Sequence, residues 1–380
     1  MRLALIGPVY PFRGGIAHYT TRLAQAVAAS GHSLLLVSFK RMYPHWLFPG
    51  QSDQDPSENP LKVEQAQYWI DSMNPLTWLA TFRRIRAYQP DAIILQWWTP
   101  FWAPTWLVLG ILNHWSLHCP LIMLCHNVLP HEAHPWDPLL AKLVLRWATS
   151  FVVQSEEEER RLHRLLPQAQ TTVFPLPVLD LWEEQVVPKE QARAQLGLPA
   201  DIPVLLFFGI VREYKGLQDL LAAMPAIQAR LGQLVLLVAG EFWEDETPYR
   251  QAIQRLGIQD LVRLENRYIP NEEAVVYFSA ADLLVAPYRT VTGSAVVQMA
   301  RGFGLPVVTT QLSGLAEMTE GALGLLAPPA DPAGLAATII QYFQDRLEPN
   351  LRELIQQRRD QYSWEQLVAL LQTLARETES

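Results

Sequence analysis

The sequence predicts an α/β protein with two doubly wound, Rossmann-like domains, each a parallel sheet covered by helices on both faces. Short apolar runs separated by segments of helical periodicity are the first observation, and they include AIILQ, LIMLC, FVVQS, VLLFF, LVLLVAG, LLVAP and PVVTT. Parallel strands that are buried on both faces have this appearance. The second observation is a repeated plan, since RLALIGPVYPFRGG and PVLLFFGIVREYKG each read as a strand, a glycine-containing loop and the start of a helix, the first helix from about Ile16 to Ala29. A chain of 380 residues is long enough for two such domains.

The boundary between the domains is expected where the periodicity lapses. In the stretch VFPLPVLDLWEEQVVPKEQ, Pro175, Pro177 and Pro188 interrupt both strand and helix patterns. We therefore expect a first domain over residues 1–182 and a second over residues 183–361.

Composition narrows the class of protein. Apolar residues make up 49% of the chain and charged residues 18%, which is typical of a globular enzyme. Two cysteines, Cys119 and Cys125, are too few for a disulfide framework in a chain of this size, so we expect a reducing, cytoplasmic compartment. The N-terminal apolar run is too short for a signal peptide, and no run of about 18 uninterrupted apolar residues predicts a membrane-spanning helix.

Charge is divided unevenly along the chain. The net charge of −8 argues against a general nucleic-acid binder. Residues 1–180 contain 14 Lys and Arg against 13 Asp and Glu, whereas residues 181–380 contain 16 against 25. All nine histidines also lie in the first half. We therefore expect any contact with the inner face of the cytoplasmic membrane to be made by the first domain.

Two loops of the second domain have the features of a phosphate site. In FFGIVREYKG a strand ends at Gly209, and Arg212 and Lys215 follow before the next helix. In LLVAPYRTVTGSAVV a second strand ends before a loop with Thr292, Gly293 and Ser294. A helix N-terminus, glycine backbone and two cations together suit a diphosphate. Taken alone, the spacing of Arg212 and Lys215 is more typical of a solvated turn than of a phosphate site.

At this point the chain resembles the retaining glycosyltransferases of family 4, which have the GT-B architecture. The resemblance rests on motifs in matching order: Gly14-Gly15 before the first helix, CHN at 125–127, FFGIVREYKG, NRYIPNEEAVVYFSAADLLVAPYR, GLPVVTT, SGLAE and YSWEQL. It implies two domains facing across a cleft, with a C-terminal helix of about residues 362–380 packing back on the first domain. It also implies a nucleotide-diphospho-sugar donor, a saccharide or lipid-linked acceptor, and a role in cell-surface polysaccharide or glycolipid synthesis.

The resemblance assigns roles to residues of this sequence. Arg212 and Lys215 would neutralise the leaving diphosphate, and His126 would reach the transferred sugar. Further donor-binding residues would be Gly14, Gly15, Gly209, Tyr268, Ile269, Thr292, Gly293, Ser294 and Glu317. The mechanism implied is metal-independent front-face attack with retention, a hexosyl or related transfer of enzyme class EC 2.4 that needs no cofactor.

One departure from the family pattern concerns the donor. The family usually carries two glutamates eight positions apart, on either side of the loop that here contains Thr292, Gly293 and Ser294. An ungapped alignment puts Val291 and Met299 at these positions. Backbone N–H groups, with Thr292 or Ser294, could bind sugar hydroxyls instead. The loss leaves two alternatives open: a non-catalytic GT-B protein that binds a nucleotide or glycan as a partner subunit, and a nucleotide-sugar epimerase of the same fold.

Three other groups of residues in the first domain could carry function. Asp53 and Asp55 have a metal-binding spacing but stand in a polar, proline-rich loop, which favours a solvated turn. A His/Cys/Glu group between His114 and His134 lacks the spacing of known zinc motifs. The aromatic residues near position 100 suit either the core or an acceptor-side or membrane surface, and the acceptor-side candidates are Trp97, Trp98, Trp102 and His131, with Trp102 and Trp106 as candidates for membrane contact.

Overall fold

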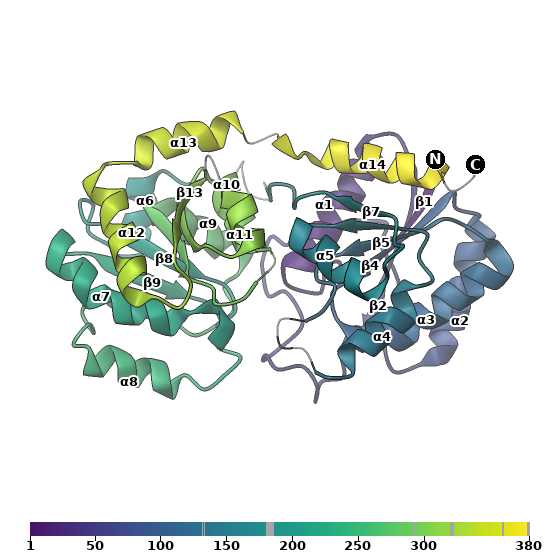
Figure 1. Cartoon of the computed structure of the whole chain (residues 1–380), viewed down its shortest axis with the longest axis horizontal. Helices are drawn as coiled ribbons and strands as arrows, with labels where there is room; N and C mark the ends of the chain where they lie inside the picture. Colours follow the sequence, from purple (N-terminus) through teal and green to yellow (C-terminus); the bar gives the residue numbers. More distant parts are fainter. Residues whose placement is uncertain are drawn as a thin grey trace. The chain divides into compact units, whose positions relative to one another are not determined.

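The computed structural model of the 380-residue chain describes residues 1–130, 132, 134–179, 186–291, 293–319, 323–358 and 361–377. The chain divides into two compact units (Figure 1). The first comprises Met1–Asp55, Pro60–Pro177 and Tyr362–Ser380, and the second comprises Pro56–Asn59 and Val178–Gln361. The expected boundary at residue 182 lies outside the described residues. No helix in the described ranges is both long enough and apolar enough to cross a bilayer.

The first unit contains a seven-stranded parallel sheet in the order β3-β2-β1-β4-β5-β6-β7. Its strands are β1 (Arg2–Ile6), β2 (Ser33–Arg41), β3 (Gln67–Asp71), β4 (Ala92–Trp97), β5 (Leu121–Cys125), β6 (Ser150–Val153) and β7 (Thr171–Val173). Its helices are α1 (Gly15–Ala29), α2 (Pro75–Tyr88), α3 (Ala103–Leu112), α4 (Asp137–Leu145), α5 (Glu156–Leu165) and α14 (Trp364–Glu377), with short turns η1 (Pro100–Trp102) and η2 (Asn113–Leu117).

The connections decide which face of this sheet each helix covers. The chain leaves β1 toward β2 in one direction and then steps from β3 to β4, β5 and β6 in the opposite direction. Because such crossovers are right-handed, α2, α3 and α4 cover one face and α1 covers the other. The C-terminal helix α14 packs on α1, where the rings of Trp364 and Tyr19 meet at 5.0 Å.

The second unit repeats the plan with six parallel strands in the order β10-β9-β8-β11-β12-β13. Its strands are β8 (Val204–Phe208), β9 (Val235–Ala239), β10 (Val262–Glu265), β11 (Leu283–Ala286), β12 (Val307–Thr310) and β13 (Gly324–Ala327). Its helices are α6 (Lys189–Gln195), η4 (Glu213–Lys215), α7 (Leu217–Leu231), α8 (Thr247–Arg255), α9 (Asn271–Ala280), α10 (Ala295–Gly302), α11 (Ser313–Thr319), α12 (Pro332–Gln344) and α13 (Glu348–Gln357). The predicted fold class, two doubly wound α/β halves, is confirmed.

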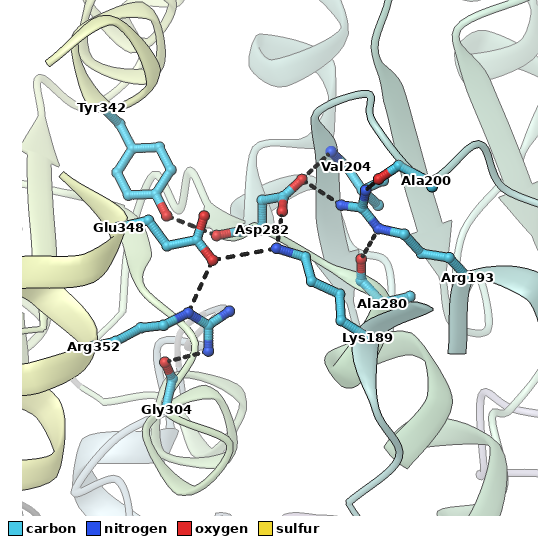
Figure 2. A network of polar contacts seen from close by, with 10 residues as sticks. All are labelled: Lys189, Arg193, Ala200, Val204, Ala280, Asp282, Gly304, Tyr342, Glu348 and Arg352. Atoms are coloured by element: carbon cyan, nitrogen blue, oxygen red, sulfur yellow. Dashed lines mark hydrogen bonds and ion pairs between the residues drawn. The ribbon is translucent and has the colours of Figure 1, made fainter. Parts of the chain in front are cut away.

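The amino edge of the second sheet is held by a charged network (Figure 2). Asp282, just before β11, accepts hydrogen bonds from Val204 N and from Arg193 Nη2, both at 2.7 Å, and it forms an ion pair with Lys189. Lys189 also pairs with Glu348 at 3.3 Å, and Glu348 in turn accepts from Arg352 Nε at 2.9 Å. The network therefore ties α6 and α13 to the starts of the two central strands.

Candidate active site

Each sheet has one pair of adjacent strands whose following connections run toward opposite sides of the sheet. In doubly wound proteins, ligands bind at the carboxyl ends of these two strands. In the second unit this pair is β8 and β11. The loops that follow these strands are residues 209–216 and 287–294. They are the two loops that the sequence indicated as a phosphate site.

The two loops are fastened together by backbone contacts. Gly216 has φ +70°, and a Cβ at this position would lie 1.9 Å from the carbonyl oxygen of Pro287, so only glycine fits there. Arg289 N donates to Tyr214 O at 2.7 Å. The Arg289 guanidinium also forms a bidentate pair with Asp219 of α7, at 2.8 and 2.7 Å. These contacts therefore fix the position of the two loops relative to each other.

Lys215 is the cation at the centre of this arrangement. Its Nζ lies 5.4 Å from the centroid of the Tyr288 ring and 3.4 Å from the position that a Cβ on Gly209 would take. No carboxylate within the described ranges pairs with it. Burial lowers the pKa of Lys215, and the neighbouring Arg212 charge lowers it further, while Tyr214 raises it. An anion that reached this ammonium would relieve the cost of leaving it unpaired and partly desolvated.

The helix after the second loop supplies a further anion-compatible feature. Ser294 is the N-cap of α10, and its hydroxyl accepts from Val297 N at 3.3 Å. The Tyr288 hydroxyl lies 3.4 Å from Ser294 Oγ. The helix N-terminus thus points into the loop region that holds Lys215, where its partial positive charge adds to the ammonium.

The other residues of the second unit that were predicted to bind the sugar donor lie on several elements. Tyr268 is half-buried and Ile269 is buried in the segment before α9, Gly293 precedes the α10 cap, and Glu317 is exposed on α11. Arg212 precedes η4 and is half-buried. Val291 and Met299, which stand where the family has glutamates, are apolar side chains that are only 8% and 7% exposed and therefore buried. Thr292 lies outside the described residues.

In the first unit His126 stands just after β5 in a polar network of neutral side chains. Gln154 Nε2 donates to His126 Nδ1 at 2.9 Å, and the other ring nitrogen, Nε2, donates to Gln96 Oε1 at 2.6 Å. Gln96 Nε2 donates onward to Thr20 Oγ1 at 2.7 Å. Burial lowers the pKa of His126 to about 3, so the ring is neutral near pH 7. Both ring nitrogens are used locally, and contact with a sugar through either one would require an exchange of partners.

Two glutamines of this network were missed in the sequence interpretation. Gln96 is fully buried at the end of β4, and Gln154 follows β6. The available signal was a single polar residue at the carboxyl end of an otherwise apolar run, in AIILQ and in FVVQS. Gly14, with φ +104°, directly precedes Gly15, the first residue of α1.

The predicted acceptor-side tryptophans require a correction. Trp97 is 0% exposed, and Trp102 and Trp106 are each 1% exposed. The Trp102 ring packs 4.4 Å from that of Phe39 and 5.6 Å from that of Trp106, inside the hydrophobic core of the first unit. These side chains therefore stabilise the fold and present no surface to an acceptor or a membrane.

Trp98 and His131 are the remaining acceptor-side candidates. Trp98 is half-buried, and its indole N–H donates to Tyr43 Oη at 3.0 Å. His131 lies outside the described residues. Across the described ranges no group of three or more His, Cys, Asp or Glu side chains is arranged to hold a metal ion.

Comparison with known proteins identifies the family. Residues 14–177 match the model of the glycosyl transferase 4-like domain, and residues 202–345 match the model of glycosyl transferases group 1. The chain therefore belongs to the glycosyltransferases of GT-B fold and family 4 type.

Relatives and solved structures agree with this assignment. The chain is 32% identical over 258 residues to D-inositol 3-phosphate glycosyltransferase 1 of Catenulispora acidiphila, covering 62% of this chain and 61% of that protein. It is 33% identical over 163 residues to the D-inositol 3-phosphate glycosyltransferase of Corynebacterium efficiens, covering 41% and 38%. These matches span less than two thirds of either relative.

Similar structures include the sucrose-phosphate synthase of Thermosynechococcus elongatus, with a TM-score of 0.73 at 23% identity, covering 99% of each chain. Another is Anabaena HepE in complex with UDP-glucose, with a TM-score of 0.73 at 18% identity, covering 98% of this chain and 100% of that one. At these identities the likeness shows the shared fold.

Proposed function

We propose that this glycosyltransferase moves a sugar from a nucleotide-diphospho-sugar to a saccharide or lipid-linked acceptor with retention of configuration, in the synthesis of cell-surface polysaccharide or glycolipid. The observation that carries the proposal is Lys215, a partly buried cation at the carboxyl end of β8 with no carboxylate partner in the described ranges. A diphosphate is the anion that such a glycine-rich, doubly cationic loop suits. The UDP and UDP-glucose complexes of Anabaena HepE support a nucleotide diphosphate in particular.

Catalysis in this proposal is charge stabilisation by fixed groups. As the glycosidic bond breaks, negative charge accumulates on the departing diphosphate, and Lys215, Arg212 and the N-terminus of α10 stabilise it. The acceptor hydroxyl attacks from the face that the diphosphate leaves, and a departing phosphate oxygen takes its proton. His126 is proposed to contact the transferred sugar, with Gln96 and Gln154 fixing its ring. No metal and no cofactor is required by this scheme.

Donor screening tests the proposal. UDP-, GDP- and ADP-sugars are added to the protein, and thermal unfolding is followed; a ligand at 100 times its dissociation constant stabilises by about 2.7 kcal/mol. The same screen on Lys215→Ala is the matched control and should lose most of the shift. Incubation with the stabilising donor and NMR of the product then report hydrolysis, transfer and the anomeric configuration.

The outcomes separate the alternatives. Release of sugar with its original anomeric configuration supports the retaining transferase, and inverted product contradicts it. Donor binding without hydrolysis or transfer supports a binding partner subunit. Conversion of one nucleotide-sugar into another supports an epimerase.

A further inference from the structure

Exposed apolar side chains are concentrated on one part of the first unit. Among the described residues eleven large apolar side chains are exposed, and the second unit contributes only Val186. Seven of the eleven lie on or beside α2, α3 and α4: Met73, Leu76, Leu79, Trp115, Trp136, Leu139 and Leu143. Leu76, Trp115 and Leu139 are 73%, 75% and 62% exposed. A gathering of this kind marks an interaction surface.

These side chains share one face of the unit, which we call the helix layer and define as residues 73–88, 103–118 and 134–146. Helix α2 packs on α3, and α3 packs on α4 (Figure 1). The right-handed crossovers place all three on the same face of the sheet. Helices α2 and α4 both begin at the carboxyl edge, so Leu76 and Leu139 lie toward that edge.

The charges of the helix layer have one sign. Its exposed cations are Arg83, Arg84, Arg86, Lys142 and Arg146. Its one acidic residue, Asp137, is only 5% exposed. A chain of net charge −8 thus carries a cationic, partly apolar surface.

The cations of the layer are also unpaired, in contrast to those of the neighbouring helix α5. On α5, Arg160, Arg161 and Arg164 form ion pairs with glutamates of the same helix at 3.2 to 3.5 Å. In the described part of the chain none of the five cations of the helix layer pairs with a carboxylate; Arg84 instead lies 4.6 Å from the centroid of the Trp69 ring. The charge of the layer is therefore free to meet an external anionic surface.

We propose that the helix layer docks on an anionic lipid bilayer. Exposed leucines and tryptophans enter the interface between headgroups and acyl chains, while the arginines and lysine meet the lipid phosphates, the combination of two signals that stable peripheral binding requires. Docking rests on the proposed function in one respect, since it would bring the enzyme to a lipid-linked acceptor.

Vesicle sedimentation tests the proposal with the full-length protein. The probes are vesicles of phosphatidylcholine alone and of phosphatidylcholine with phosphatidylglycerol. The charge variant Arg83→Glu/Arg84→Glu should bind the anionic vesicles at least about 25-fold more weakly, since each lost cation alone accounts for about fivefold. The apolar variant Leu76→Ser/Leu139→Ser should bind at least about tenfold more weakly.

Two matched control variants alter exposed residues elsewhere and leave the helix layer unchanged. Arg230→Glu/Arg255→Glu removes two exposed cations of the second unit, and Trp46→Ser removes a 78% exposed ring of the first unit outside the layer. Both should bind vesicles within about twofold of the unaltered protein. Circular dichroism and donor hydrolysis, which needs no membrane, check that each variant is folded and active.

The experiment distinguishes failure of the docking proposal from failure of the proposed glycosyltransferase function. Loss of vesicle binding with normal donor hydrolysis in both layer variants supports docking. The proposal is overturned if the unaltered protein ignores anionic vesicles, if the controls lose as much as the layer variants, or if the layer variants instead abolish self-association, which would make a second copy the occupant. Absence of donor turnover in every variant, with binding intact, would overturn only the proposed function.

Discussion

Two groups of cations lie at opposite edges of the second sheet, and they are built differently. At the amino edge Arg193, 4% exposed, and Lys189 are paired with Asp282, and Lys189 also pairs with Glu348. At the carboxyl edge Lys215 faces a tyrosine ring and has no carboxylate partner in the described ranges.

This difference suggests a structural role for the paired cations at the amino edge and a ligand-binding role for Lys215 at the carboxyl edge. Removal of the carboxylate partner of a buried cation is costly for folding, because it leaves the charge uncompensated. A cation that is partly desolvated and unpaired contributes little to folding and is available to a ligand. The comparison predicts opposite consequences for substitutions at the two edges.

The largest effect on stability is expected from Asp282→Ala. It leaves the buried Arg193 guanidinium without its carboxylate and Val204 N without its acceptor, so the free energy of unfolding should fall by about 3–5 kcal/mol. Urea unfolding measures this loss. Turnover per folded molecule should be unchanged, because the network lies at the edge of the sheet remote from Lys215.

Asp345→Ala is the control for this substitution, since Asp345 is an exposed carboxylate at the end of α12 without an ion pair in the described residues. Its effect should stay within about 0.5 kcal/mol. A similarly small effect of Asp282→Ala would show that the amino-edge network does not stabilise the unit.

Lys215→Ala should produce the reverse result. Loss of one preorganised charge at the leaving group costs about 3–4 kcal/mol of transition-state stabilisation, so turnover should fall by roughly two to three orders of magnitude. Arg212→Ala should act similarly, and the double variant should fall short of additivity because both cations serve one diphosphate. Steady-state kinetics and urea unfolding together make the measurement, and the unfolding free energy should change by less than about 1 kcal/mol.

Arg230→Ala, at the other end of α7, is the matched control and should keep normal turnover. If Lys215→Ala retains both normal turnover and normal donor affinity, the carboxyl-edge cations are a solvated turn and the comparison fails.

Features encoded by local sequence could be predicted, and the strand that leads into the proposed phosphate loop is among them. The run VLLFF is strand β8 (Val204–Phe208), and the helix expected from about Ile16 begins at Gly15 and ends at Ala29 as predicted. Such runs depend on periodicity and flanking glycines, which are visible in a single segment.

Features that depend on distant partners could not be predicted. The Asp219–Arg289 pair joins residues 70 positions apart, and His126 meets Gln96 and Gln154 from two other strands. Nor does an apolar segment reveal which of its rings face outward, which is why Trp102 was kept as a candidate for the surface although it is in the core.

Gly216→Ala sharpens the comparison by separating loop packing from charge. The new Cβ would strike the Pro287 carbonyl oxygen, and the residue would keep a positive φ, so we expect a loss of about 2–4 kcal/mol together with reduced turnover. Gly257→Ala is the control, because Gly257 has φ +65° with nothing within 4 Å of the added Cβ, and it should cost only about 1 kcal/mol. Equal losses in unfolding experiments would mean that backbone strain alone, and not the contact between the loops, explains Gly216.

The smallest effect is expected from metal removal. Two carboxylates of this region already have a cationic partner, since Asp219 forms the bidentate pair with Arg289 and Glu213 lies 3.6 Å from the same guanidinium. In the proposed function, the positive charge for the diphosphate would come from Lys215, Arg212 and the N-terminus of α10, in the place where a divalent cation would act. Excess EDTA should therefore change turnover by less than about twofold, a factor equivalent to about 0.4 kcal/mol in the barrier. If EDTA lowered turnover and manganese or zinc restored it, the prediction of metal-independent catalysis would be contradicted. The next residues to substitute would then be Asp53 and Asp55 of the first unit.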